Sequence, residues 1–138
     1  MSSVSLTTAA RAFLDEVRFG TLATVNRHGI PSQVLVWYML DGDAILVSTP
    51  VKSYKVRNLR SNPWASLSVS EGPRYVTVRG RATMDEGPER GIALYRQIAT
   101  RYLGAEAAEQ WLAQASRRGA ADRVTLRLSI EHVISTQR

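Results

Sequence analysis

The chain has 138 residues, of which 44% are hydrophobic and 22% charged, a composition that suits a single domain over residues 1–138 with one core. It contains no cysteine, which excludes disulfides, thiolate metal sites and cysteine nucleophiles. Its net charge of +6, from 18 basic and 12 acidic residues, favours an anionic partner such as a phosphate, a polycarboxylate or a nucleic acid, or else a solvated basic surface.

The hydrophobic pattern predicts six strands, joined mostly by hairpins, and helices at three places. In chain order we expect a helix at 5–17, strands at 19–25, 31–40 and 44–49, a helix at 53–60, strands at 64–70 and 74–84, a helix opening at Pro88, a second helical piece at 105–115 and a strand at 123–134. Ser5 is the expected N-cap of the first helix. The apolar run 34–40 indicates that the second strand is buried on both faces. Short antiparallel strands in succession favour a small barrel over a doubly wound sheet.

Residues 48–63, STPVKSYKVRNLRSNP, concentrate positive charge where the third strand passes into a helix. The first turn of a helix has free backbone N–H groups, and its dipole favours an anion. A hydroxyl and an ammonium group would complete a phosphate site there. The alternative is that Ser53 only caps the helix and the lysines are solvated. The residues expected at the site are Ser48, Thr49, Ser53, Lys55 and Asn58, the last as a brace or as a ligand contact.

Other chemistries find little support. The two histidines, His28 and His132, stand in no metal-ligand spacing, so we expect no metal site. Neither a glycine-rich nucleotide fingerprint nor a G-x-S-x-G elbow is present, so any difficult chemistry would come from a bound organic cofactor. No apolar run reaches membrane-spanning length and the first residues lack the apolar core of a signal peptide, so we expect a cytoplasmic protein without a membrane partner.

Aromatic side chains could stack on a ligand ring or donate a proton to it. Core packing is the alternative, above all for Trp37, which lies in an apolar run. The candidates are Trp37, Tyr38, Tyr54 and Tyr75. Trp64 and Trp111 are interpreted as packing residues.

Four segments, in order, resemble those of the split-barrel flavin-binding proteins, the pyridoxamine 5'-phosphate oxidase-like superfamily. They are GTLATV with HGIP (20–25 and 28–31), ST with SYKVRNLRSNP (48–49 and 53–63), RYVTVRGRA (74–82) and RVTLRLSIEHV (123–133). The resemblance implies a mainly β fold, a six-stranded antiparallel split β-barrel with flanking helices. It also implies a homodimer with two cofactors in clefts at the interface.

The resemblance also implies roles for individual residues. Ser53 and Lys55 would hold the cofactor phosphate, with Thr49 at the end of the preceding strand. Tyr75 would reach the cofactor from the partner subunit. The backbone of the second strand would run along the ring system, at Gln33, Val34, Leu35 and Val36.

Two departures separate this chain from oxidases that act on pyridoxamine phosphate. Gln33 stands where those enzymes carry arginine, and the chain ends in SIEHVISTQR without their arginine- and tryptophan-bearing segment. The K-x-x-N-L-R-x-[ND]-P pattern at 55–63 is closer to a short actinobacterial branch, many of whose members use the deazaflavin F420 instead of FMN. The resemblance thus implies an F420H2-dependent reductase that transfers hydride to an unsaturated or conjugated small-molecule acceptor.

Charge decides between the two cofactors, because F420 carries a phosphodiester and a polyglutamate tail and is more anionic than FMN. Basic residues beyond Lys55 could bind that tail, namely Lys52, Arg57, Arg60, Arg74, Arg79 and Arg81. Three alternatives to the F420 reductase stay open: an FMN oxidase or reductase, a non-catalytic cofactor carrier and a nucleic-acid binder. The last is disfavoured because no aromatic-rich recognition strand accompanies the basic residues.

Overall fold

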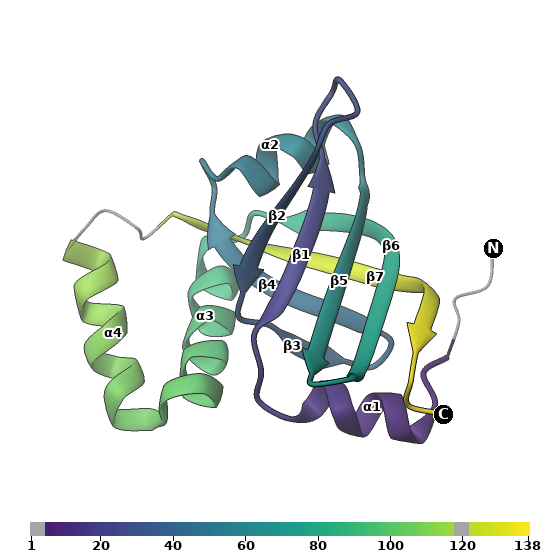
Figure 1. The fold of residues 1–138 in the computed structure, drawn as a ribbon. Coiled ribbons are helices and arrows are strands. Elements are labelled where there is room, and N and C mark those ends of the chain that lie inside the picture. Colours follow the sequence, from purple (N-terminus) through teal and green to yellow (C-terminus); the bar gives the residue numbers. More distant parts are fainter. Residues whose placement is uncertain (1–4, 118–121) are drawn as a thin grey trace.

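The computed structural model describes residues 5–117 and 122–138, and Figure 1 shows how their helices and strands are arranged. The elements are α1 (Thr8–Asp15), β1 (Gly20–Val25), β2 (Pro31–Val36), β3 (Met39–Asp41), β4 (Ala44–Pro50), α2 (Tyr54–Ser61), β5 (Trp64–Glu71), β6 (Arg74–Asp85), α3 (Pro88–Leu103), α4 (Ala105–Arg117) and β7 (Arg123–Ser135). The strands form one antiparallel sheet in the order β2-β1-β5-β6-β7-β4-β3.

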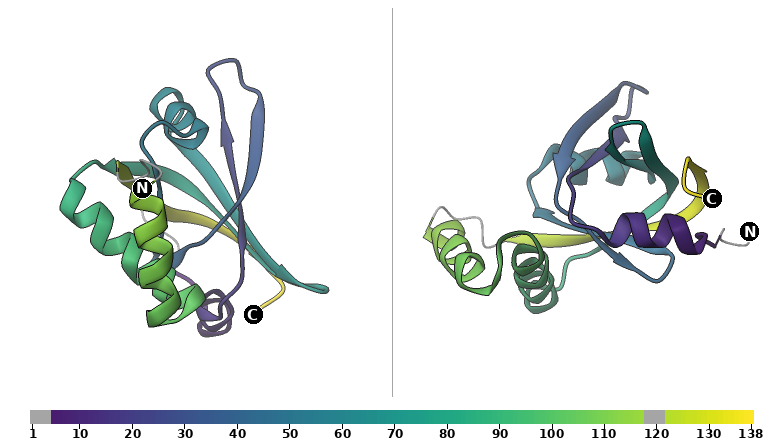
Figure 2. Two further views of the ribbon diagram at one scale, coloured as in Figure 1. Left: turned by 90° about the vertical axis from the view of Figure 1, so that its left-hand side faces the viewer. Right: turned by 60° about the horizontal axis from the view of Figure 1, so that its bottom comes forward.

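The sheet curls around a core and the helices flank it, as both views in Figure 2 show. Helix α2 packs on β1, α1 lies against β3 and β6, and α3 covers β7 and β4. Helix α4 packs against α3 on the outside of the molecule. The mainly β architecture with flanking helices is therefore confirmed. The count of six strands is wrong, because there are seven, and the barrel is not closed: β2 and β3 end the strand order.

The extra strand arises where the expected strand 31–40 breaks at Trp37 and Tyr38. Tyr38 turns into the core and its hydroxyl donates to the Leu14 carbonyl at 2.7 Å. The Trp37 ring turns aside to stack on Tyr102, with 5.1 Å between ring centroids. These two anchors are incompatible with one continuous strand, so β2 ends at Val36 and β3 begins at Met39.

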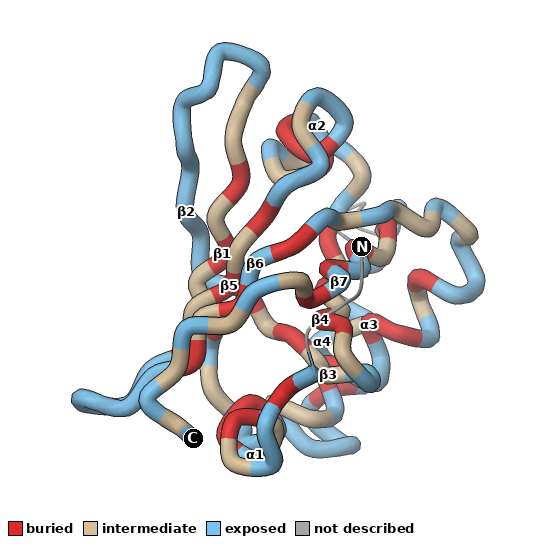
Figure 3. Tube along the Cα trace, turned by 90° about the vertical axis from the view of Figure 1, so that its right-hand side faces the viewer, coloured by how far each residue is buried: buried red, intermediate tan, exposed pale blue. Residues whose placement is uncertain are grey.

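Burial of the second strand on both faces was also a wrong expectation. Val34 is 42% exposed and Leu35 66% exposed, and Figure 3 shows almost the whole of β2 in the exposed colour. Strand β2 pairs only with β1, so one of its edges has no strand partner among residues 5–117 and 122–138. This edge borders the candidate site described below.

The core lies between the inward faces of the sheet and helices α1 and α2. The expected alternation along β6 is confirmed, since Val76 and Val78 are fully buried while their neighbours are not. The first helix begins later than expected, because Thr7 rather than Ser5 is the N-cap and accepts a hydrogen bond from the Ala10 N–H at 3.0 Å. No helix of the described ranges is both long and apolar enough to span a bilayer.

Candidate functional site

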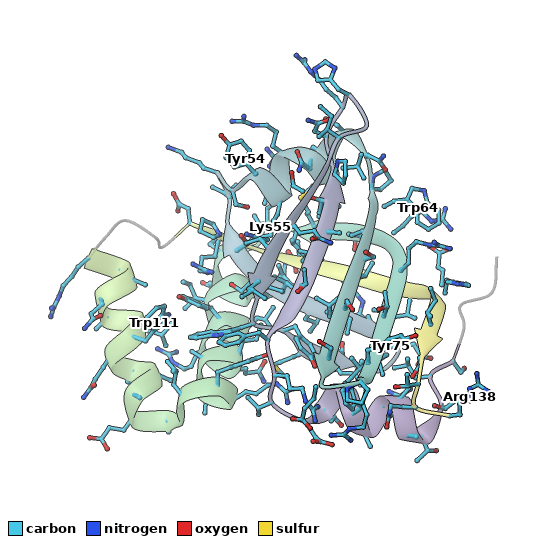
Figure 4. The ribbon with its side chains drawn as sticks, viewed as in Figure 1. Tyr54, Lys55, Trp64, Tyr75, Trp111 and Arg138 are labelled. Atoms are coloured by element: carbon cyan, nitrogen blue, oxygen red, sulfur yellow. The ribbon has the colours of Figure 1, made fainter. Side chains whose placement is uncertain are left out.

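A cleft of about 340 Å³ opens between the free edge of β2, the end of β4, the start of α2 and the helical pair α3–α4. One of its ends is cationic and the other is aromatic. Figure 4 shows Lys55 and Trp111 reaching it from α2 and α4. Its lining residues are Phe19, Leu35, Val36, Trp37, Ser48, Thr49, Pro50, Lys55, Tyr95, Ile98, Trp111 and Arg123.

The cationic end holds two positive side chains, Lys55 and Arg123. Neither Lys55 nor Arg123 forms an ion pair with any acidic residue in the described ranges. Burial lowers the pKa of the Lys55 ammonium, and the Arg123 guanidinium lowers it further. Burial also lowers the pKa of Arg123. Two half-buried like charges side by side are costly unless an anion compensates them, so this end of the cleft could accept an anion.

Arg123 is held rigidly although it has no acidic partner among residues 5–117 and 122–138. Its Nε donates to the Ser48 hydroxyl at 2.9 Å and its Nη2 donates to the Ser48 carbonyl at 3.1 Å. The guanidinium carbon lies 3.6 Å from the centre of the Tyr95 ring, a cation–π contact. The register of the β4–β7 pair explains why Arg123 meets Ser48: Arg123 at the start of β7 pairs with Pro50 at the end of β4, two residues after Ser48. The remaining guanidinium N–H groups are free to donate to a ligand.

The start of α2 provides polar groups beside Lys55. Thr49 is buried and donates to the Ser53 hydroxyl at 3.1 Å, and that hydroxyl accepts from the Val56 N–H at 3.4 Å. Ser53 is therefore the N-cap of α2, and its own hydroxyl proton stays available. Capping and ligand binding, the two alternatives for Ser53, are thus compatible.

The other end of the cleft is an aromatic wall. Trp37 stacks on Tyr102. The centres of the Trp37 and Trp111 rings lie 5.5 Å apart, and their planes are inclined by 45°. The Trp111 indole N–H donates to the Tyr95 hydroxyl at 2.6 Å. Phe19 extends the wall by stacking on Tyr102, with 6.2 Å between the ring centres. Such a surface suits a planar ring, which it can cover and shield from water.

The structure brings five of the predicted site residues together in this cleft: Leu35, Val36, Ser48, Thr49 and Lys55. Ser53 lies beside them through its bond to Thr49. Gln33 and Val34 lie on the same strand outside the lining. That any of these residues binds a cofactor stays a prediction.

Three predicted residues lie elsewhere. Asn58 is buried and its amide donates to the Thr24 hydroxyl at 3.0 Å, so it braces α2 against β1. Tyr54 is 74% exposed and borders a separate hollow. Tyr75 lies at the far end of the sheet from Lys55, as Figure 4 shows. That Tyr75 reaches the cleft of a second copy of the chain stays a prediction.

Some candidate roles are not supported by the contacts. Tyr38 is fully buried and its hydroxyl donates to the Leu14 carbonyl. Burial raises the pKa of Tyr38 to about 12, so it does not reach the cleft as a proton donor.

Three arginines expected to bind an anionic tail already have acidic partners. These ion pairs are Arg60 with Glu86, Arg74 with Glu71 and Arg81 with Glu131.

Sequence reasoning missed half of the lining. Trp111, interpreted as a packing residue, belongs to the aromatic wall, as does Trp37, for which stacking and packing were both open. Phe19, Tyr95 and Arg123 were not considered as ligand contacts. The sequence held one signal for Arg123: it opens the last strand, and no acidic residue follows it on that strand before Glu131.

Within the described ranges, no three acidic or histidine side chains gather as a metal site requires.

The chain belongs to the pyridoxamine 5'-phosphate oxidase family, whose model matches residues 6–137. This match confirms the resemblance found in the sequence.

Two solved structures of similar chains have a TM-score of 0.74. One, an F420 reductase, is 26% identical and matches over 94% of this chain and 98% of its own. The other, the conserved hypothetical protein Rv2991 from Mycobacterium tuberculosis, is 25% identical over 99% of this chain and 90% of its own. The heme storage protein HutZ from Vibrio cholerae shares the fold alone, at 21% identity and a TM-score of 0.63, over 96% of this chain and 95% of its own.

Proposed function

We propose that this protein is an F420H2-dependent oxidoreductase that transfers hydride to an unsaturated or conjugated small-molecule acceptor. The observation that carries the proposal is the pair Lys55 and Arg123, two unneutralised cations at one end of a cleft whose other end is aromatic. A planar redox ring with an anionic chain matches both ends. The similarity to an F420 reductase supports the choice of deazaflavin.

The residues of the cleft have distinct tasks in this proposal. Lys55 and Arg123 bind the anionic ester, with the Ser53 hydroxyl and the first turn of α2. The free edge of β2 offers backbone N–H and C=O groups to the polar rim of the ring. Trp37 and Trp111 cover the ring and exclude water. When bound, the reduced deazaflavin supplies the hydride.

A proton for the product can come from solvent or from Tyr95. Because the Tyr95 hydroxyl accepts from the Trp111 indole, its own O–H remains free to donate towards the cleft. Of the other phenols named above, Tyr38 donates to the Leu14 carbonyl and Tyr102 to the Arg18 carbonyl, and Tyr54 and Tyr75 lie outside the lining. Tyr95 is thus the phenol best placed for this task.

An FMN-dependent oxidase or reductase is the second candidate. The observation in its favour is that Arg60, Arg74 and Arg81 are paired with acids, so the surplus of free charge that favoured the longer cofactor is smaller than the sequence implied. FMN would use the same cationic corner and the same wall. A carrier that binds either cofactor without turnover would have the same cleft.

A homodimer in the cytoplasm completes the proposal. Tyr75 is 37% exposed and lies at the other end of the sheet from Lys55, as Figure 4 shows. The exposed apolar side chains of Leu35 and Ile134 would be covered by a second copy. In such a dimer Tyr75 contributes to the partner's cleft.

The test is a titration of the purified protein with F420 and with FMN, followed by tryptophan fluorescence. Two of the three tryptophans, Trp37 and Trp111, lie in the cleft, so a bound ring quenches their emission. We expect tighter binding of F420 at moderate salt, and oxidation of F420H2 with a panel of quinones and enones. Equal or tighter binding of FMN would shift the proposal to the flavin. Tight F420 binding without turnover would support a carrier.

A further inference from the structure

A second hollow, of about 440 Å³, lies between α2 and the turn that joins β1 to β2. We call it the α2 hollow. Figure 1 shows the tip of this hairpin beside α2. It is lined by Asn26, Arg27 and His28 from the turn and by Tyr54, Arg57, Asn58 and Ser61 from the helix. The predicted phosphate site does not include the turn residues.

The α2 hollow is positively charged. No acidic residue lines it, and neither Arg27 nor Arg57 forms an ion pair with a carboxylate of residues 5–117 or 122–138. The Arg57 guanidinium lies 5.3 Å from the centre of the Tyr54 ring. The neighbouring Arg60 differs, because it is paired with Glu86. Within the described ranges, one cation without an acidic partner therefore faces the hollow from α2, Arg57, and one from the turn, Arg27.

The walls of the hollow are preorganised. In the turn, the Asn26 side chain accepts from the His28 N–H at 2.8 Å and from the Ile30 N–H at 3.0 Å. Gly29 takes a φ of +80°, which a residue with a side chain rarely adopts. On the other wall, the 95%-buried Asn58 is tied to Thr24. Fixed walls reduce the entropy cost of holding a charged ligand.

The α2 hollow and the cleft lie on adjoining sides of one helix turn. Tyr54, Arg57, Asn58 and Ser61 follow the spacing of one helix face, and Lys55 lies on the next face. A ligand whose anionic ester sits at Lys55 can therefore continue past Tyr54 towards Arg57. Its continuation would meet positive charge on both walls.

We propose that the α2 hollow binds a polycarboxylate tail, the part of the ligand that extends beyond the anionic ester in the cleft. This inference rests on the proposed function, because the glutamate tail of F420 is such a chain. It assigns the tail to Arg27 and Arg57, in place of the paired arginines Arg60, Arg74 and Arg81. The number of glutamates then sets the affinity.

The experiment measures the dissociation constants of F420 forms with no glutamate, one glutamate and several glutamates, by tryptophan quenching at low salt. Carboxylate–guanidinium contacts on a surface are weak singly, so we expect about a tenfold gain in affinity from no glutamate to several. The variant R27Q/R57Q should lose this gain while binding the form without glutamates as the wild type does. The matched control R60Q changes a paired arginine on the same helix and should keep the gain.

The outcomes separate the two proposals. If all forms bind alike, or if R27Q/R57Q keeps the gain, the hollow does not bind the tail and the proposed function stands. If R60Q loses the gain as fully as R27Q/R57Q, a general charge effect explains it and the inference is wrong. If no form binds, the proposed function and this inference both fail. Thermal unfolding of each variant verifies that it is folded.

Discussion

Replacing Lys55 by methionine tests the cationic end of the cleft, because the substitution removes the charge and keeps an unbranched apolar stem. In the proposed complex the ammonium donates a charge-assisted hydrogen bond to the anionic ester. Such a bond contributes about 1.5–3 kcal/mol. We therefore expect the cofactor dissociation constant of K55M to rise by about 10- to 150-fold.

The same substitution should stabilise the free protein. Burial and the nearby Arg123 guanidinium lower the pKa of Lys55, which means that the folded state disfavours its charged form. Below the lowered pKa the folded protein therefore bears a cost that the unfolded chain does not, and this cost disappears as the pH rises past the lysine's ordinary pKa. K55M should unfold at a higher temperature than the wild type at neutral pH, and the difference should shrink towards pH 10.

The assay combines thermal unfolding of the free protein between pH 7 and pH 10 with a titration of cofactor at pH 7. K52M is the matched control, since Lys52 is exposed and lies outside the lining of the cleft. It should leave the unfolding temperature unchanged and weaken cofactor binding far less than K55M does. Retained affinity in K55M would show that the anion binds elsewhere. A lower unfolding temperature of K55M at pH 7 would show that the uncompensated charge is not a cost to the folded state.

Three further substitutions test other contacts. R123Q removes the second cation of the cleft and should weaken cofactor binding by about 1.5–3 kcal/mol, measured by the same titration; an unchanged affinity would remove Arg123 from the site. Y38F deletes the buried hydrogen bond to Leu14 and should cost about 1–2 kcal/mol of stability in chemical denaturation. Because the pKa of Tyr38 is raised to about 12, its contribution is present below pH 10 and lost towards pH 12, so the stability of Y38F should fall less over that range. G80A places a Cβ against the Ser129 carbonyl oxygen at the β6–β7 bulge and should destabilise the fold by about 3 kcal/mol or more; wild-type stability would contradict that packing.

Most of the fold follows from local patterns in the sequence. Alternation along β6, the glycine turns and the helix caps act within a few residues, so they can be read directly, and Ser53 as the N-cap of α2 is an example. The break between β2 and β3 does not follow from such patterns. Trp37 and Tyr38 extend an apolar run, and only their distant partners Tyr102 and Leu14 show that the strand must end there.

The same limit applies to the candidate site. Lys55 and Thr49 were identified because the chemistry of a strand end followed by a helix start is local. Arg123 lies 68 positions after Lys55 and meets it only because β7 pairs with β4 in this register. Trp111 reaches the cleft only because α4 folds back along α3. Neither contact has a signal in the neighbouring sequence.

Charge also illustrates why position matters more than the total. The sequence suggested a broad excess of free cations around the cofactor, but Arg60, Arg74 and Arg81 are each paired with an acid. The unpaired cations of the cleft and the α2 hollow are instead Lys55 and Arg123 on one side of α2, and Arg27 and Arg57 on the other. An anionic ligand that spans both groups must pass the first turn of α2. The Val56 N–H of that turn is used by the Ser53 cap, which leaves the N–H groups of Tyr54 and Lys55 for an anion. In the proposal, the helix start thereby joins the two sites into a single binding surface.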